Sequence, residues 1–285
     1  MSLINSVNTN TGAMIALESL NTTNSELAAV QKQVSTGYRV ADATDDGAAY
    51  AVAQSVRSEV GGLTTANQQL GNVQGLLSTT QSGLNNISNT MASMRDVLVS
   101  LSDGNVTGNE RSQYVTQYQS LAASVKNYIQ DAGYNGKTLI GNITGSEGFH
   151  TTLSHVLTVR NELGTTYGLA TFSGSGLYTS LNFTTTQLGG ASTVAGLITG
   201  AFTNQTNAVG TALNKVGSET NFVNSQISYN NDKIDALNSG LGSLVDADLA
   251  KESAQLQALQ IRQQLGTQAL SLANQAPQTL LSLFK

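Results

Sequence analysis

The sequence of 285 residues has no cysteine, no tryptophan and one proline, Pro277. Without cysteine the chain can form no disulfide, thiolate nucleophile, iron–sulfur cluster or cysteine-ligated zinc site. Scarce proline favours long helices, because proline removes a backbone N–H donor and clashes with the preceding helical turn. These absences predict a fold that is held together by helix packing without covalent cross-links.

Charge is also scarce: 11% of the residues are charged and the net charge is −5, whereas about 25% are charged in a typical soluble domain. No run of Lys and Arg is present that could neutralise a nucleic-acid backbone, so we expect no nucleic-acid partner. The sequence has no stretch of 18 consecutive apolar residues, so we expect no membrane insertion. The N-terminal residues lack the basic and apolar segments of a cleaved secretory signal, so we expect export without one.

Apolar spacing predicts long helices at both ends of the chain. In residues 1–142 a first stripe repeats at 7, 3 and 4 residues: Leu20, Leu27, Val30 and Val34. A second helix is expected to be capped by Asp45 or Asp46 and to continue to Leu101, where a turn follows at 102–105. Residues 206–285 are again helical in pattern, and Asp246 is expected to cap the final helix.

The middle block, residues 143–205, differs in composition, with only three charged residues and many Gly and Thr. Short strands are expected over 151–160, 166–173 and 177–185, with a turn at 174–176. The fold class predicted is mainly α: a long rod-like helical bundle or coiled coil formed by the N- and C-terminal segments, with a small β-rich insertion at the tip.

We expect three domains from this pattern. Residues 1–42 with 243–285 are predicted to form a terminal coiled coil. Residues 43–142 with 206–242 are predicted to form a helical rod, and 143–205 a variable, surface-exposed domain.

Few residues are arranged as catalytic or metal-binding groups. His150 and His155 lie five residues apart in the middle block, without the helical spacing or further ligands of a zinc site. Asp42, Asp45 and Asp46 lack the Gly and the terminal Glu of a calcium loop, so we interpret them as turn and cap residues. We expect no enzyme activity, no cofactor and no metal.

The two ends of the chain carry the strongest signal for function. Residues 1–17 and 263–284 have no charged side chain but keep apolar residues at helical spacing. The alternative is that they are frayed tails, which termini often are. The stripes instead predict tails that order against neighbouring copies in an assembly, where burial offsets the ordering entropy. The residues of this assembly stripe are Leu20, Leu27, Val30, Val34, Leu249, Leu256, Leu259, Leu265 and Leu272.

Five segments, in order and at both ends, resemble bacterial flagellin. They are VSTGYR (34–39), DDGAAYAV (45–52), YNGKTLI (134–140), DADLAKE (246–252) and LANQAPQTLLSLF (272–284). The resemblance covers about 220 of the 285 residues and leaves the middle block unmatched. It implies a structural subunit that self-assembles into the extracellular flagellar filament, the helical propeller for swimming.

The resemblance further implies type III export of the unfolded chain, an export chaperone on the C-terminal helix, and contacts with the filament cap and the hook-junction proteins. It implies that both termini line the inside of the filament and that the middle block faces outward. A hook–filament junction protein and a surface-exposed flagellin that binds glycans are the alternatives, the latter because Tyr167, Phe172, Tyr178 and Phe183 punctuate the middle block.

Many flagellins activate an animal innate receptor through a motif similar to Gln-Arg-x-Arg-Glu-Leu. The matching stretch in this sequence is Ala92, Ser93, Met94, Arg95, Asp96 and Val97. One arginine is kept and the other is lost, which predicts weak or absent activation of the receptor.

Overall fold

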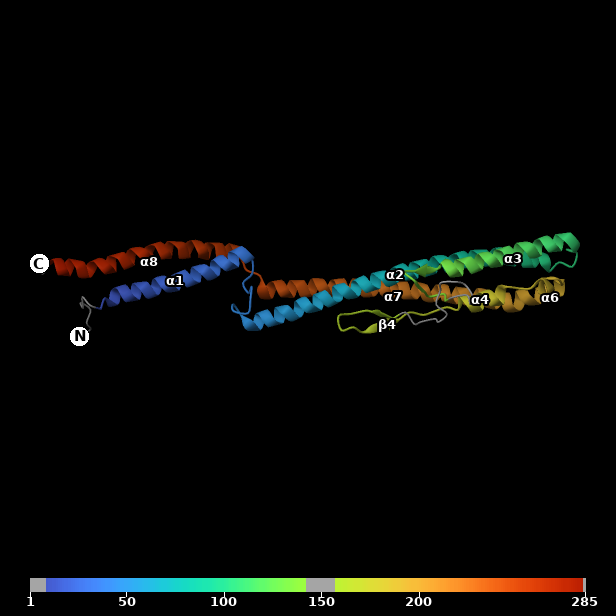
Figure 1. Ribbon diagram of the computed structural model, residues 1–285, viewed down its shortest axis with the longest axis horizontal. Coiled ribbons are helices and arrows are strands. Elements are labelled where there is room, and N and C mark those ends of the chain that lie inside the picture. The colour runs from blue at the N-terminus through green and yellow to red at the C-terminus, as the bar shows by residue number, and fades with distance from the viewer. Residues whose placement is uncertain (1–8, 142–156, 284–285) are drawn as a thin grey trace. The chain divides into compact units, whose positions relative to one another are not determined.

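The computed structural model describes residues 9–141 and 157–283 and divides into two compact units. Residues 1–58 with 235–285 form the terminal unit, and residues 59–234 form the central unit. Long helices dominate both units, as the sequence predicts (Figure 1). These are α1 (Thr11–Thr36), α2 (Gly47–Leu101), α3 (Gly108–Asp131), α7 (Thr203–Val245) and α8 (Leu249–Leu283).

Helix ends in the terminal unit follow local capping rules. Gly37, at φ 73°, ends α1, and its N–H donates to the Gln33 carbonyl. Asp46 caps α2 as predicted, since its Oδ1 accepts from the N–H groups of Ala48 and Ala49, each at 3.0 Å. The predicted cap of the last helix is wrong by two residues: Asp248 accepts from the N–H of Ala250 at 3.0 Å. Asp246 forms an isolated β-bridge with Tyr38 instead.

The segments that were expected to be disordered before assembly are helical over their described parts. α1 begins at Thr11, and α8 continues through Pro277 to Leu283. The apolar face of each helix is the reason, because the two helices lie side by side and cover part of each other (Figure 1).

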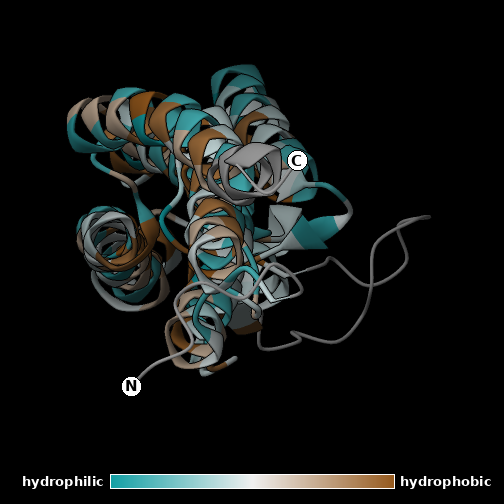
Figure 2. Cartoon of the chain, turned by 90° about the vertical axis from the view of Figure 1, so that its left-hand side faces the viewer, coloured by the Kyte–Doolittle hydropathy of each residue, from teal (hydrophilic) through white to brown (hydrophobic). Residues whose placement is uncertain are grey.

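The central unit is built on α2, α3 and α7, which share one apolar core. Side chains from α2 recur at helical spacing and are almost fully buried: Leu70, Leu77, Leu84, Ile87, Met91, Met94, Leu98 and Leu101. Tyr118, Val125 and Ile129 from α3 and Val209, Val216 and Val223 from α7 complete this core. Hydrophobic and hydrophilic residues alternate along the helical ribbons (Figure 2).

Two short antiparallel strand pairs lie in the central unit. β1 (Gly133–Tyr134) pairs with β2 (Lys137–Thr138). Asn135 and Gly136 connect them at φ 49° and 72°, the positive values that a type I′ hairpin turn needs. β3 (Leu157–Val159) pairs with β4 (Thr166–Gly168). Of the expected strand 151–160 only the last part is described, and the strand expected over 166–173 is shorter.

The rest of the middle block is helical, which corrects the third predicted strand. The elements are α4 (Gly174–Leu181), α5 (Thr185–Leu188), α6 (Ala191–Leu197) and the π-helical turn η1 (Ile198–Phe202). The turn predicted at 174–176 is the start of α4, where the Ser173 hydroxyl accepts from the Gly176 N–H at 3.1 Å. Leu177 and Leu181, four residues apart, are buried in the core, and this packing outweighs the β-propensity of the segment.

The β3–β4 hairpin lies alongside the helices, which differs from its predicted position at the tip. Its turn packs against Gly62 of α2, where an added Cβ would lie 3.0 Å from the Glu162 Cβ. Gly62 is about 60 Å along α2 from the turn that follows Leu101, at 1.5 Å per residue. The short helix α5 lies near that turn, because Arg111 hydrogen-bonds to both Leu101 and Leu188.

Candidate assembly interface

α1 and α8 form an antiparallel pair in the terminal unit. Near the start of α1, Asn10 donates to the carbonyl of Ala273 at 2.7 Å. Further along, Gln263 donates to Asn24 at 2.7 Å, and Arg262 lies 3.6 Å from Glu26. Rising residue numbers in α1 therefore meet falling numbers in α8, so the N- and C-terminal helices pair in antiparallel orientation.

Six of the nine residues of the assembly stripe lie at least half-buried in this unit. Val30 is 4% exposed and Leu259 is 3% exposed. The half-buried members are Leu20, Leu27, Val34 and Leu256. A glycine allows a close approach, because a Cβ at Gly266 would lie 3.2 Å from a methyl group of Leu20. These six residues stabilise the pair within one chain.

The other three stripe residues point away from the pair. Leu249 is 49% exposed, Leu265 is 59% exposed and Leu272 is 70% exposed. Leu265 and Leu272 share a face of α8 with Ile261, which is 59% exposed, since spacings of 4 and 7 residues return to the same side of a helix. Leu256 lies nine residues before Leu265, about half a rotation away at 100° per residue. α8 therefore has two apolar faces, of which α1 covers one.

The beginning of α1 carries further apolar side chains that the helix pair leaves uncovered. Met14 is 65% exposed, Ile15 is 68% exposed and Leu17 is 47% exposed. Because Asn10 lies opposite Ala273, these side chains lie at the same end of the helix pair as Leu272. Single exposed apolar residues are ordinary, but a group of them marks an interaction surface. We call Met14, Ile15, Leu17, Ile261, Leu265 and Leu272 the outer apolar surface.

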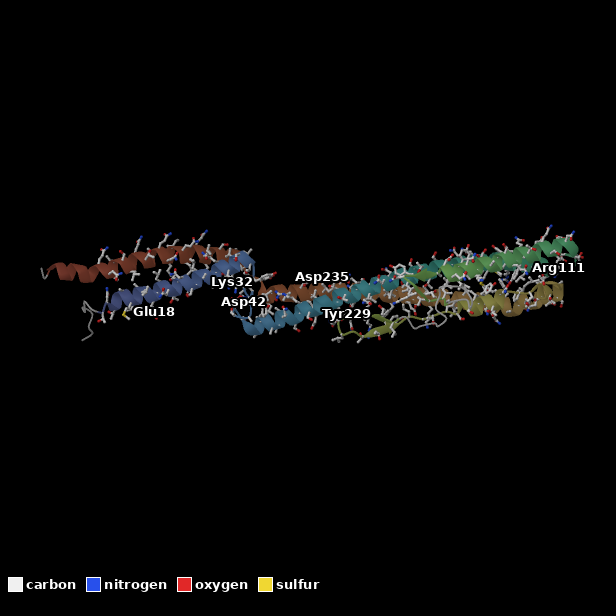
Figure 3. The ribbon with its side chains drawn as sticks, in the orientation of Figure 1. Glu18, Lys32, Asp42, Arg111, Tyr229 and Asp235 are labelled. Atoms are coloured by element: carbon white, nitrogen blue, oxygen red, sulfur yellow. The ribbon has the colours of Figure 1, made fainter. Side chains whose placement is uncertain are left out.

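The segment between α1 and α2 contains an ion cluster that the sequence did not predict. The Lys32 ammonium lies 2.6 Å from a carboxylate oxygen of Asp42 and 2.9 Å from one of Asp45 (Figure 3). These hydrogen bonds lower the pKa of both carboxyl groups and raise the pKa of Lys32. Asp45 also accepts from the N–H of Ala41 at 3.0 Å. The predicted turn and cap roles of the aspartates are confirmed, and in the described part of the chain no group of acidic or histidine side chains could hold a metal ion.

The same segment is tied to the end of α7. Arg39 donates from its guanidinium to the Leu244 carbonyl at 2.6 Å and from its N–H to the Val245 carbonyl at 2.7 Å. Val40 and Val245 are each 1% exposed and pack with Ala49 and Ala53. Three of the five segments that carry the family resemblance, 34–39, 45–52 and 246–252, begin or end at this corner. The presence of these three segments was the signal in the sequence that could have identified this group of residues.

The remaining candidate residues lie in the central unit or outside the described residues. In the receptor motif, Met94 and Val97 are buried in the core, and Ala92, Ser93, Arg95 and Asp96 are exposed. Phe183 stacks on Tyr118 with ring centroids 5.6 Å apart, and Tyr167 stacks on Phe222 at 4.2 Å. Phe172 and Tyr178 are partly buried against the core, so these aromatics contribute to packing. His150 and His155 lie outside the described residues.

Comparison with known proteins decides the family. Residues 7–144 match the bacterial flagellin N-terminal helical region, and residues 198–284 match the bacterial flagellin C-terminal helical region. The chain belongs to the bacterial flagellins. It is 34% identical over 284 residues to flagellin FljK of Caulobacter vibrioides, covering 99% of each chain. It is 31% identical over 294 residues to a flagellin of Brucella melitensis, covering 98% of this chain and 99% of that one.

Flagellins are structural proteins, and this flagellin is a structural subunit of the bacterial flagellar filament. Solved structures agree with the fold. A putative flagellar hook-associated protein of Vibrio parahaemolyticus superposes with a TM-score of 0.56 at 15% identity, covering 71% of this chain and 100% of that one. FlgL of Bacillus cereus superposes with a TM-score of 0.54 at 12% identity, covering 66% and 98%. Along the described residues, no helix is both long and apolar enough to cross a membrane.

Proposed function

We propose that this flagellin polymerises by burying its outer apolar surface against neighbouring copies. The observation that supports this is the second apolar face of α8, where Ile261, Leu265 and Leu272 are each more than half exposed. Fully burying a side chain of this size stabilises an assembly by about 1.5–3 kcal/mol. Several such residues per subunit therefore favour association of the copies.

The low charge of these chain ends suits close packing of identical subunits. Residues 1–17 and 263–284 carry no charged side chain, so parallel copies experience little like-charge repulsion at this surface. When one part of this surface contacts a different part of the next copy, the contact is heterologous. Contacts of this kind generate open helical filaments.

The three predicted domains give a proposed layering of the filament. Residues 1–42 with 243–285 would form the inner coiled-coil layer, and residues 43–142 with 206–242 the tube around it. Residues 143–205 would face outward. The stripe residues would have two roles. Val30 and Leu259 would hold the helix pair together, and Leu265 and Leu272 would contact other subunits.

Export and assembly partners follow from the same surface. The outer apolar surface on α8 needs cover before assembly, so we propose that an export chaperone binds this helix. We also propose export through the flagellar type III route without a cleaved signal peptide, and contacts with the cap and the hook-junction proteins through the terminal helices.

Seeded polymerisation of the full-length protein tests the role of the outer apolar surface, with filament length scored by negative-stain electron microscopy. Leu265→Asp places a charge on the uncovered face, and we expect it to abolish elongation while circular dichroism shows an unchanged helix content. Gln264→Asp is the matched control: it adds the same charge at the neighbouring exposed position, and we expect elongation to persist.

Normal elongation of the Leu265→Asp variant would overturn the assignment of this face as the polymerising surface. Equal loss in both variants would also overturn it, because charge anywhere on α8 would then be the cause. Leu259→Asp is expected to lose both the α1–α8 pairing and elongation, since Leu259 is 3% exposed within the chain.

A further inference from the structure

The β3–β4 hairpin is held firmly at its turn. The Asn230 amide, 0% exposed, donates to the Arg160 carbonyl at 3.0 Å and to the Asn67 amide oxygen at 2.8 Å. The Lys233 ammonium lies 2.5 Å from a carboxylate oxygen of Glu162. This hydrogen bond lowers the pKa of Glu162. Asn230, Lys233 and Glu162 therefore each have a hydrogen-bond or ion-pair partner in this contact.

The base of the same hairpin is held differently, through Glu219 of α7. Glu219 is 4% exposed, and its Oε1 accepts from the Ala170 N–H at 2.7 Å. Its Oε2 is buried and has no hydrogen-bond partner among the described residues. The hydroxyl of Thr158, which lies opposite Tyr167 in the strand pair, is orphaned in the same way. Within the described part of the chain these are the two buried side-chain atoms without a partner.

Neither protonation state of Glu219 is well satisfied at this position. Among the described residues, the titratable groups that act on it are Lys215, one turn earlier on α7 and itself exposed, and the Tyr167 hydroxyl from β4. Residues 60–94 of α2 contain no titratable side chain, and neither do residues 169–173. As an anion Glu219 is a buried charge without a close cation, which is more costly than a buried neutral acid.

Burial is the largest influence on this carboxyl group. Desolvation raises the pKa of Glu219, and the Ala170 hydrogen bond and the Lys215 charge oppose that shift without cancelling it. The pKa of Glu219 would return to the ordinary range if the segment over it moved away, because water would then solvate the carboxylate.

We propose that Glu219 is a proton-controlled latch for residues 166–172, which stay docked on α7 when the carboxyl is protonated and detach when it ionises. Tyr167 and Ala170 are the contacts that would be released, the first from its stack on Phe222 and the second from the Glu219 oxygen. The same segment forms one wall of a cavity of about 330 Å³, through Ala170, Thr171 and Phe172. Detachment would therefore remove this wall and widen the cavity.

The direction of the pH dependence follows from linkage. A carboxyl whose pKa is higher when the segment is docked binds a proton on docking. Docking is therefore most stable below the ordinary Glu value of about 4.3 and weakens as the pH rises through the raised value. Each pKa unit between the docked and the released state weakens docking about tenfold. The latch rests on contacts within one chain and is independent of the proposed polymerising surface.

The test uses full-length monomeric protein and two measurements over pH 4–9. The first follows the carboxyl ¹³C signal of Glu219, assigned by its loss in Glu219→Gln. The second follows hydrogen exchange of the Ala170 amide, corrected for intrinsic exchange. We expect Glu219 to titrate above the ordinary Glu value and Ala170 protection to fall tenfold for each unit of that shift. We expect Glu219→Gln to keep constant protection.

Three results would overturn the latch. These are an ordinary titration of Glu219, constant protection in the unmodified protein, and an unchanged pH dependence in Glu219→Gln. Glu162→Gln is the control at the other end of the hairpin: it removes the ion pair with Lys233 and is expected to leave the pH dependence at Ala170 intact. Loss of that dependence in Glu162→Gln would assign the effect to the turn and not to Glu219.

Discussion

Arg111 donates from its guanidinium to the carbonyl oxygen of Leu101, the last residue of α2, at 2.7 Å. The same side chain donates to the carbonyls of Val106 at 3.0 Å and Leu188 at 3.1 Å. Figure 3 places Arg111 near the end of the central unit where α2 stops. The last carbonyls of a helix have no partner within that helix, so one arginine satisfies the ends of α2 and α5 and the turn between α2 and α3.

Replacing Arg111 by methionine should therefore destabilise the central unit. The methionine keeps much of the aliphatic stem but leaves three carbonyls without their donor. Hydrogen bonds to a charged group contribute about 1.5–3 kcal/mol each in favourable cases, and because Arg111 is only half-buried we expect a loss of about 2–3 kcal/mol in all. Urea unfolding followed by circular dichroism measures this loss. Arg111→Lys should recover part of the stability, and equal stability of all three proteins would contradict the capping role.

Two glycine-to-alanine changes should change the free energy of unfolding in opposite directions. A Cβ at Gly174 would lie 2.5 Å from the Ile129 side chain and 2.9 Å from the Ile140 carbonyl, so either α4 or the core must shift. Overpacking of this kind costs about 1–3 kcal/mol. A Cβ added at Gly71, within α2, would meet no neighbouring atom of the described residues within 4 Å. Alanine is the better helix former by about 0.5–1 kcal/mol.

The measurement is the urea midpoint of each variant under identical conditions. Gly174→Ala should lower the midpoint and Gly71→Ala should raise it. A rise of both midpoints would show that backbone propensity, and not the close approach at Gly174, controls the outcome, and a fall for Gly71→Ala would contradict the open space at that position.

How far the sequence predicts this fold depends on whether the decisive signal is local. The apolar spacing from Leu70 to Leu101 correctly predicts that α2 continues past Gly61-Gly62, because a periodic stripe of that length can be buried only as a helix. Asp46 is correctly predicted as a cap because capping also depends on residues that are close in the sequence. The predicted cap Asp246 is wrong, because Asp246 is held in a β-bridge with Tyr38 and Asp248 caps the helix. That bridge joins residues far apart in the chain.

The same distinction applies to the middle block and to the candidate interface. The Thr residues and the Gly-containing turn before them favour a strand over 177–185, and only the core that receives Leu177 and Leu181 selects a helix. Apolar spacing identifies the stripe on α8, but it cannot say which face α1 covers, so Leu259 and Leu265 look equivalent by sequence. The ion cluster of Lys32 with Asp42 and Asp45 needs the turn after Gly37 to bring its members together.

Receptor activation should respond to changes at the exposed side of the degenerate motif. Ala92 and Ser93 are exposed on α2, whereas Met94 and Val97 are buried. We expect the unmodified protein to give weak or no signal in a receptor reporter-cell assay. The double variant Ala92→Gln with Ser93→Arg restores the residues that the family motif has there, and it should raise the signal without loss of stability. Full potency of the unmodified protein would contradict the proposed role of the lost arginine.

Acidification should loosen the segment between α1 and α2. The Lys32 ammonium lowers the pKa of Asp42 and Asp45 in the folded chain, so their contribution to stability is complete above the ordinary Asp value of about 3.9. It is lost as the pH falls below that value and through the lowered ones, because the folded state then must take up protons that the unfolded state already holds.

The amides of Thr44 and Ala41 report on this change, since they donate to Asp42 at 2.8 Å and to Asp45 at 3.0 Å. Their NMR shifts should titrate below pH 4 in the unmodified protein. Lys32→Met should move both transitions upward toward the ordinary value, because the positive charge that favours the carboxylates is gone. Lys251→Met, which removes an exposed lysine of α8, should leave them in place. Unchanged transitions in Lys32→Met would mean that the backbone donors alone stabilise the two carboxylates.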